Sequence, residues 1–194
     1  MADTTTIPAQ IRMSAGDRTR DIVVKYGFLA VTVIAFVFFA LTEPAFATAN
    51  SMFSMLKFAS VTAILGLGVM FSMIVGGLDL SIGSVAGLSV QLAAMTMVFY
   101  NLTAGMAITF VLIAGLAVGL LNAFLIVVCK IPDLLATLGM MFVIQGAKMI
   151  PVAGQSVSSG MIMPDGASAP GKFDPTFLLI DRGTIGPVPM PVII

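Results

Sequence analysis

Five long apolar runs dominate this sequence of 194 residues. A helix needs about 20 mostly apolar residues to cross the hydrocarbon core of a bilayer, and its backbone polar groups must be hydrogen-bonded within the segment. The runs are continuous, whereas the strands of a transmembrane barrel alternate. We therefore predict an all-α, polytopic transmembrane helix bundle with about five complete spans, over residues 26–41, 58–75, 82–100, 105–128 and 134–150.

The composition excludes several classes of protein. Only 9% of the residues are charged and 59% are hydrophobic, whereas about a quarter of a soluble domain is charged. There is no histidine, and Cys129 is the only cysteine, so a Cys/His metal site and an internal disulfide have no ligands or partners. The sequence lacks a GxxxxGK[ST] phosphate loop and a basic surface for nucleic acid. We expect no enzymatic activity, no catalytic residues, no metal and no cofactor.

The polar segments divide the rest of the chain. Residues 1–25 form a polar N-terminal tail, and residues 151–191 form a loop rich in Gly, Pro, Ser and Asp, with room for a short strand at Thr176–Ile180. Residues 192–194 resemble the start of a sixth span that is cut off. We accordingly expect the chain to be the N-terminal portion of a longer protein.

Basic residues predict the orientation in the membrane. Cytoplasmic segments carry an excess of Lys and Arg, and the tail holds four of them. A cytoplasmic tail places Lys130 on the same side and puts Lys57 and the 151–191 loop in the periplasm. The tail residues that carry this prediction are Arg12, Arg18, Arg20 and Lys25.

Polar and small residues form stripes within three predicted spans. Amides at membrane depth are costly, so they either bond across helices or face an aqueous path; both interpretations stay open. Glycines four residues apart allow close helix packing. Lys148 is expected to extend to the headgroups. The helix-packing candidates are Gly83, Gly87, Gly115 and Gly119, and the candidates for a translocation path are Gln91, Asn122, Thr137 and Gln145.

The stretch GGLDLSIGS interrupts the apolar pattern between the second and third spans. Gly76 and Gly77 are suited to ending a helix, and Asp79 or Ser81 can cap the helix that begins near Ile82. The stretch is therefore either an ordinary turn between two spans or a partly buried break whose helix ends line a polar cavity.

Three motifs in order carry a resemblance to a known family. The segment MLKFASVTAILGLGVMFSMIVGGLDLSIGSVAGLS resembles the signature region of the sugar-type ABC transporter permeases, the ribose and galactoside family of bacterial importers. LLNAFLIVVCKIPDLLATLGMM and FLLIDRGTIGPVPMPVII resemble later segments of the same family, so the resemblance covers residues 55–194. Asp133 departs from it, because family members more often have Pro or a small polar residue there, and family members are also considerably longer.

The resemblance implies a membrane-spanning permease subunit of a bacterial ABC importer that carries a sugar or related polyol across the inner membrane. It also implies three partners: a second permease subunit, identical or different, a cytoplasmic ATP-binding subunit and a periplasmic substrate-binding protein. Two alternatives remain. One is a secondary transporter or channel with a broken helix at GGLDLS, for which Asp79 is the one ionisable candidate; the other is a non-transporting truncated remnant.

Overall fold

A computed structural model describes residues 15–186 and 188–193, and most of these residues are helical. Part of the predicted tail, residues 1–14, and the last residue, Ile194, lie outside the described residues. The elements are α1 (Ala15–Thr42), α2 (Ala49–Ile74), α3 (Ile82–Val98), α4 (Ala104–Ala123), the π-helical turn η1 (Phe124–Val128), α5 (Asp133–Met149), the 3₁₀ turn η2 (Ile150–Val152), α6 (Pro175–Arg182), β1 (Thr184–Ile185), β2 (Val188–Pro189) and α7 (Met190–Ile193).

Each of the five predicted spans lies within or largely within a helix, so the helical fold class is confirmed. Among the described residues, four helical segments are long and apolar enough to cross a membrane: Val23–Thr42, Ala49–Ile74, Ala104–Val128 and Asp133–Val152. At 17 residues, α3 is shorter. Five complete spans and the start of a sixth therefore remain a prediction, although α7 does begin a helical turn at Met190.

The described chain forms two compact units that divide between Met52 and Phe53. In the first unit, α1 starts within the predicted tail and ends at an aromatic cluster. The ring of Phe46 lies 5.3 Å from that of Phe36 and 5.7 Å from that of Phe39. Thr32 and Thr42 on α1 donate their hydroxyl hydrogens to carbonyls one turn back, so these polar groups are satisfied within the helix.

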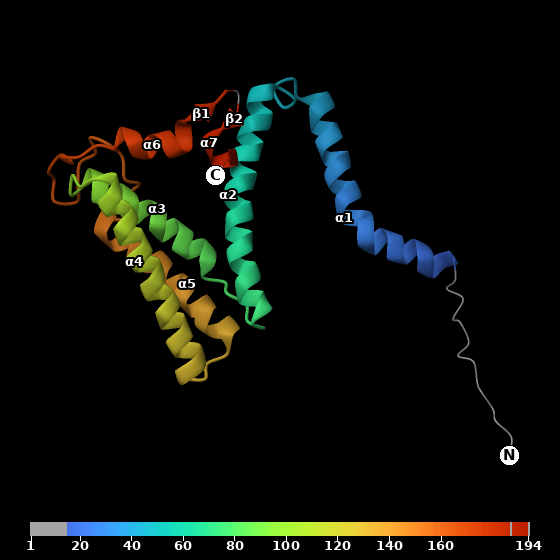
Figure 1. The fold of residues 1–194 in the computed structure, drawn as a ribbon, viewed down its shortest axis with the longest axis horizontal. Coiled ribbons are helices and arrows are strands. Elements are labelled where there is room, and N and C mark those ends of the chain that lie inside the picture. Colours follow the sequence, from blue (N-terminus) through green and yellow to red (C-terminus); the bar gives the residue numbers. More distant parts are fainter. Residues whose placement is uncertain (1–14, 187, 194) are drawn as a thin grey trace, which may run out of the picture. The chain divides into compact units, whose positions relative to one another are not determined.

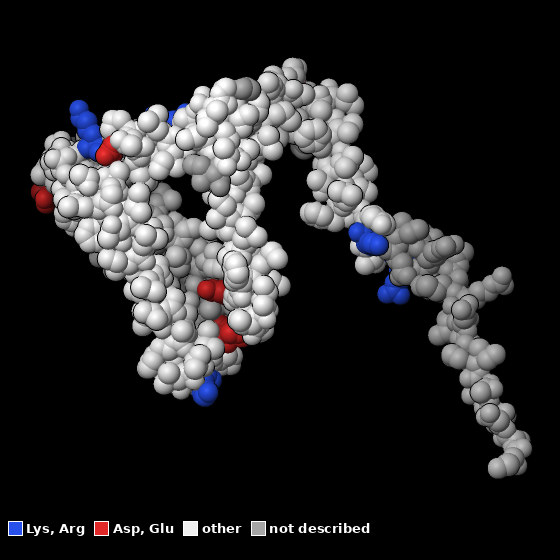
Figure 2. Space-filling view, in the orientation of Figure 1, with Lys and Arg blue, Asp and Glu red and all other residues white. Residues whose placement is uncertain are grey.

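In the second unit, α3 packs against both α4 and α5 (Figure 1). The core lies towards the C-terminal end of α3, where Ala93 and Met97 are buried together with Ala107 of α4. Phe173 and Phe177 pack against this cluster from the segment after α5. Large apolar side chains elsewhere on the helices stay exposed, as Phe28 and Phe58 illustrate at 86% and 73%, and charged atoms are sparse on the face shown in Figure 2. Apolar helix surfaces with few charges are typical of segments that face the lipid of a membrane.

The segment expected as a plain loop contains regular structure. Pro175–Arg182 is a helix, so the strand proposed at Thr176–Ile180 is wrong. Asp174 precedes this helix and accepts a hydrogen bond from the backbone N–H of Thr176 at 2.8 Å, and Pro175 occupies the first turn, where its missing N–H costs nothing. Beyond it, Thr184–Ile185 pairs antiparallel with Val188–Pro189.

An ion pair joins α2 to α6. Lys57 Nζ lies 2.7 Å from Asp181 Oδ1. The side chain of Lys57 is 27% exposed and that of Asp181 is 61% exposed. The contact brings the beginning of α2 and the end of α6 to the same end of the second unit.

Candidate functional site

The helix α2 ends in a glycine-dependent motif. Gly76 has a φ of +82°, a conformation that side chains disfavour. Its N–H donates to Met73 O at 3.0 Å, and the N–H of Gly77 donates to Ser72 O at 3.1 Å. This pair of bonds is the Schellman arrangement, which satisfies carbonyls that the end of a helix leaves free. The two glycines therefore end α2. The chain then continues into a non-helical segment, residues 78–81, which we call the break.

Asp79 organises the turn before α3. Its Oδ1 accepts hydrogen bonds from the backbone N–H of Ser81 at 2.8 Å and from the Ser81 hydroxyl at 2.6 Å. Ser81 occupies the N-cap position of α3, but its side chain makes no capping bond to the helix. The Ser84 hydroxyl instead donates to Ser81 O at 2.7 Å. Asp79 thus fixes the N-cap residue of α3, Ser81, and accepts no hydrogen bond from the first N–H groups of the helix itself.

The first turn of α5 holds the backbone of the break. Asp133 Oδ2 accepts a hydrogen bond from Leu78 N–H at 2.6 Å. Thr137 Oγ1 accepts one from Leu80 N–H at 3.2 Å, and its hydroxyl hydrogen can go to Leu78 O at 3.2 Å or to Asp133 O at 2.9 Å. Thr137 is only 1% exposed. Buried backbone outside regular structure needs such partners because its N–H and C=O groups are otherwise unpaired.

Asn122 reaches the break from α4. Its Nδ2 donates to Ser81 Oγ at 2.9 Å. Because the Ser81 hydroxyl hydrogen points to Asp79, the Ser81 oxygen can only accept, which fixes the orientation of the amide. Asn122 Oδ1 is then left buried without a partner in the described chain, and the residue is 6% exposed. A buried acceptor without a donor costs about 1–3 kcal/mol, so this amide stands out.

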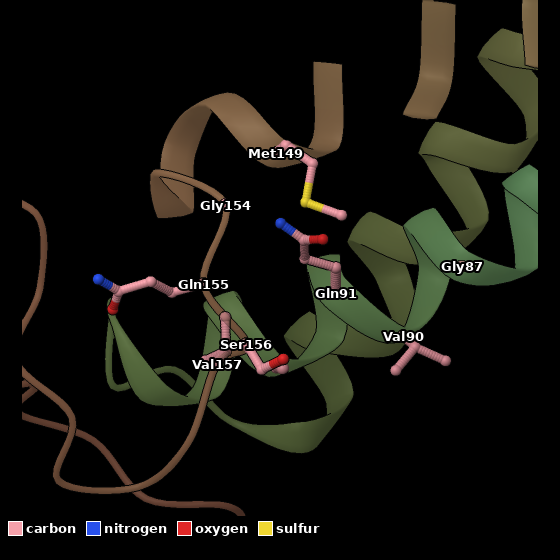
Figure 3. Close-up of a pocket in the computed structure, with 9 residues that line it drawn as sticks. Gly87, Val90, Gln91, Met149, Gly154, Gln155, Ser156 and Val157 are labelled. Carbon is pink, nitrogen blue, oxygen red and sulfur yellow. The ribbon is translucent and has the colours of Figure 1, made fainter. Parts of the chain in front are cut away.

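Gln91 lies farther along α3, one turn beyond Gly87. Its amide donates to the backbone carbonyl of Lys148 on α5. Figure 3 shows its side chain beside Met149, at a hollow of about 240 Å³ that Gln155 also lines. Gln145 is exposed. Of the four residues predicted to line a path, Asn122 and Thr137 come together at the break, Gln91 lies at a separate hollow, and Gln145 joins neither.

The predicted packing glycines behave differently from one another. A Cβ built at Gly87 would lie 2.9 Å from Lys148 Nζ, so the ammonium group of Lys148 lies close to α3 at Gly87. The expectation that Lys148 extends to the headgroups stays a prediction. A Cβ at Gly83, Gly115 or Gly119 would meet no other heavy atom of the described chain within 4 Å. Their packing role stays a prediction.

Sequence reasoning missed the role of Asp133, which it treated as a departure from a family pattern. The carboxylate binds backbone 55 residues away in the chain, and no local pattern encodes such a contact. One signal was present in the sequence: Asp133 follows Pro132 at the start of a helix. Acidic residues are stabilising there because free N–H groups point towards them.

Comparison with known proteins places the sequence in a family. The family described as "Branched-chain amino acid transport system / permease component" matches residues 51–185. The ribose import permease protein of Escherichia coli strain K12 is 30% identical over 118 residues, which are 61% of this chain and 36% of that protein. The ribose import permease protein of Haemophilus influenzae is 27% identical over 173 residues, or 89% and 50%.

A permease named for a different sugar matches a shorter stretch of the chain. The D-allose transport system permease protein of Escherichia coli strain K12 is 35% identical over 74 residues, which are 38% of this chain and 23% of that protein. These matches span half or less of each relative. No solved structure matches the chain. The resemblance in the sequence is thus confirmed, and the chain is a multi-pass membrane protein that belongs to this family of permease components.

Proposed function

We propose that this chain forms part of the membrane-spanning permease subunit of a bacterial ABC importer for a sugar or related polyol. The observation that carries the proposal is the family match over residues 51–185, together with relatives whose names are ribose, xylose and D-allose permeases. The work of the permease is transport rather than catalysis. Its partners are a second permease subunit, identical or different, a cytoplasmic ATP-binding subunit and a periplasmic substrate-binding protein.

The chemistry of the break supports a path for a polyhydroxy solute. Side chains of the break, α4 and α5 offer two hydroxyls, one amide and two carboxylates there. The sequence contains no Trp, so the Trp platforms of a tight sugar site are missing from it. A path must release what it admits. Hydrogen bonds to two hydroxyls and one amide are weak enough for that, and in this proposal the affinity resides in a separate binding protein.

The basic residues of the tail support the predicted orientation in the inner membrane, and two contacts group the helix connections by end. The contact between Leu78 and Asp133 brings the break and the exposed Cys129 turn to one end of the second unit. The Lys57–Asp181 ion pair brings the start of α2 and the segment after α5 together. We assign the first end to the cytoplasm and the second to the periplasm.

Cysteine labelling tests this orientation. In the complete permease on intact cells, an impermeant thiol reagent is expected to label Ser168→Cys in a Cys129→Ala background. The natural Cys129 is expected to react only after permeabilisation. Labelling of Cys129 on intact cells, with Ser168→Cys protected, would reverse the orientation.

Uptake by the source bacterium tests the function. Deletion of the gene is expected to reduce uptake of radiolabelled D-ribose, D-xylose or D-allose by at least tenfold, with L-leucine uptake unchanged. Restoring the complete gene should restore uptake. Loss of leucine uptake alone would refute the sugar assignment and favour the amino acid in the description of the family.

A further inference from the structure

Two hollows meet at one side chain of α4. The first, of about 270 Å³, lies among α2, α3 and α4, where Gly115 and Gly119 line it. The second, of about 470 Å³, lies beside the break, where Gly77 and Asp133 are among its lining residues. Within the described chain, Asp79 and Asn122 are the residues that line both. Ligand pockets commonly measure about 300–1,000 Å³. The second hollow falls within this range and the first is slightly smaller.

A row of hydrogen bonds stands where the hollows meet. Asn122 Nδ2 donates to Ser81 Oγ at 2.9 Å, and Ser81 Oγ donates to Asp79 Oδ1 at 2.6 Å. Ser81 is 1% exposed and Asn122 is 6% exposed, so these two members of the row are buried, while Asp79 is half-buried. The row ties α4 to the start of α3 and occupies the boundary between the two hollows.

The two sides of the row are held unequally. Asp79 and Ser81 belong to the break, whose backbone is bound to α5 through Asp133 and Thr137. In the described chain, one hydrogen bond attaches the Asn122 side chain to the row. The helix face beside it is open, because a Cβ at Gly119 or Gly115 would meet no other heavy atom within 4 Å. Asn122 therefore has both a weak attachment and space to move.

The closed arrangement also leaves Asn122 Oδ1 without a donor. Buried polar groups are nearly always hydrogen-bonded, so such an exception needs an explanation. Rotation of the amide into either hollow would expose this oxygen to water or to a hydroxyl of the solute. Opening breaks the hydrogen bond between Asn122 and Ser81, but the amide gains a new partner for Oδ1. The free energy needed for opening is lowered accordingly.

We propose that Asp79, Ser81 and Asn122 form a gate between the two hollows, with Asn122 as the moving part. This inference rests on the proposed transport function. In the closed state the side chain of Asn122 bonds to Ser81 and separates the hollows. In the open state it turns towards the Gly115 and Gly119 face of α4, and the hollows join.

Substitutions of opposite size at Asn122 test the gate. The complete permease is reconstituted in proteoliposomes with its ATP-binding subunit and binding protein, and radiolabelled D-ribose is the probe. Asn122→Ala removes the barrier, so passive D-ribose efflux without ATP should rise at least tenfold over wild type. Asn122→Leu fills the boundary with an immobile apolar side chain, so it should give no leak while ATP-driven uptake falls at least tenfold.

Thr109→Ala is the control, because Thr109 is exposed on the same helix and its hydroxyl bonds only one turn back. If the Asn122→Ala complex is folded but shows no leak, the gate is wrong. Equal leaks through Asn122→Ala and Thr109→Ala would also contradict it. If wild type imports no sugar with ATP, the proposed function fails, yet passive efflux through Asn122→Ala still decides the gate.

A metal bridge tests the closed state when Asn122→Ala does not fold. Ser81→Cys and Asn122→Cys are combined in a Cys129→Ala background, where the two native side-chain atoms are 2.9 Å apart. Micromolar Cd²⁺ should then block uptake at least tenfold, and a chelator should restore it, whereas each single cysteine variant should be unaffected. An active double variant that ignores Cd²⁺ would contradict the proposal.

Discussion

The helix α3 begins in a polar network and ends in apolar packing. At its first residues, three side chains from other segments bind the break: Asp133, Thr137 and Asn122. At its last residues, Met97 and Val98 are 1% and 0% exposed. The loop around Gly171, distant in the sequence, contacts the helix here. There, Gly171 N–H donates to Val98 O at 2.9 Å. The first end is held by directional bonds that can break one at a time, while the second end is held by close contact without free space.

The largest effect should come from Gly171→Ala at the packed end. A Cβ there would lie 2.0 Å from Met97 O and 2.9 Å from Val98 O, and backbone oxygens cannot move away as a flexible side chain does. Overpacking costs about 1–3 kcal/mol, and we expect a loss near the upper limit. Thermal unfolding of the complete permease in detergent measures it. Gly105→Ala is the control, because no neighbour lies within 4 Å; equal losses would disprove the close contact.

Thr137→Val should have the next largest effect and act at the polar end. The change keeps the shape but leaves Leu80 N–H without its acceptor. We expect a loss of about 1–2 kcal/mol from the orphaned donor. Thr62→Val is the matched control, because the Thr62 hydroxyl is exposed and bonds only to Phe58 O in its own helix. Comparable unfolding temperatures for the two variants would show that Thr137 does not hold the break.

Asp174→Ala should have a smaller effect, and one that depends on pH. The hydrogen bond from Thr176 N–H, followed by that from the Thr176 hydroxyl, lowers the pKa of Asp174 below the ordinary 3.8. The unfolded carboxyl therefore binds a proton more readily than the folded one, so the stabilisation is present above the unfolded pKa. It is lost as the pH falls through the folded pKa. The difference in unfolding temperature between wild type and Asp174→Ala should shrink on acidification below pH 3.8. Asp174→Asn should recover most of the loss at neutral pH because Asn also caps helices; a difference independent of pH would contradict this.

The smallest effect is expected for the ion pair between Lys57 and Asp181. Exposed ion pairs contribute about 0–1 kcal/mol, and Asp181 is 61% exposed. Lys57→Met should lower the unfolding free energy by less than about 1 kcal/mol, and high salt should lower wild type towards the variant. A double-mutant cycle with Asp181→Asn measures the coupling. A coupling that resists salt would mean that the pair is shielded from solvent in the assembled permease.

Predictions from the sequence succeeded where local chemistry decides the structure. Apolar runs long enough for a bilayer predict helices because lipid leaves the backbone no other partners. Gly76 marks the end of α2 because few other residues adopt its φ of +82°. The strand prediction at Thr176–Ile180 was wrong because it relied on the apolar run and not on the residues just before it. Asp174 followed by Pro175 begins a helix.

The sequence by itself determined the apolar segments, the glycines that end α2 and the family of permease components. These features depend on local composition and short motifs, and each is readable within a few tens of residues. Only the tertiary structure decided that Asp133 and Thr137 bind the backbone of the break, and that Asn122 bonds to Ser81 while Gln145 stays exposed. These contacts join residues 41 to 59 positions apart. Helices of similar composition can pack in many registers, and which polar side chains meet depends on the register that the whole bundle adopts.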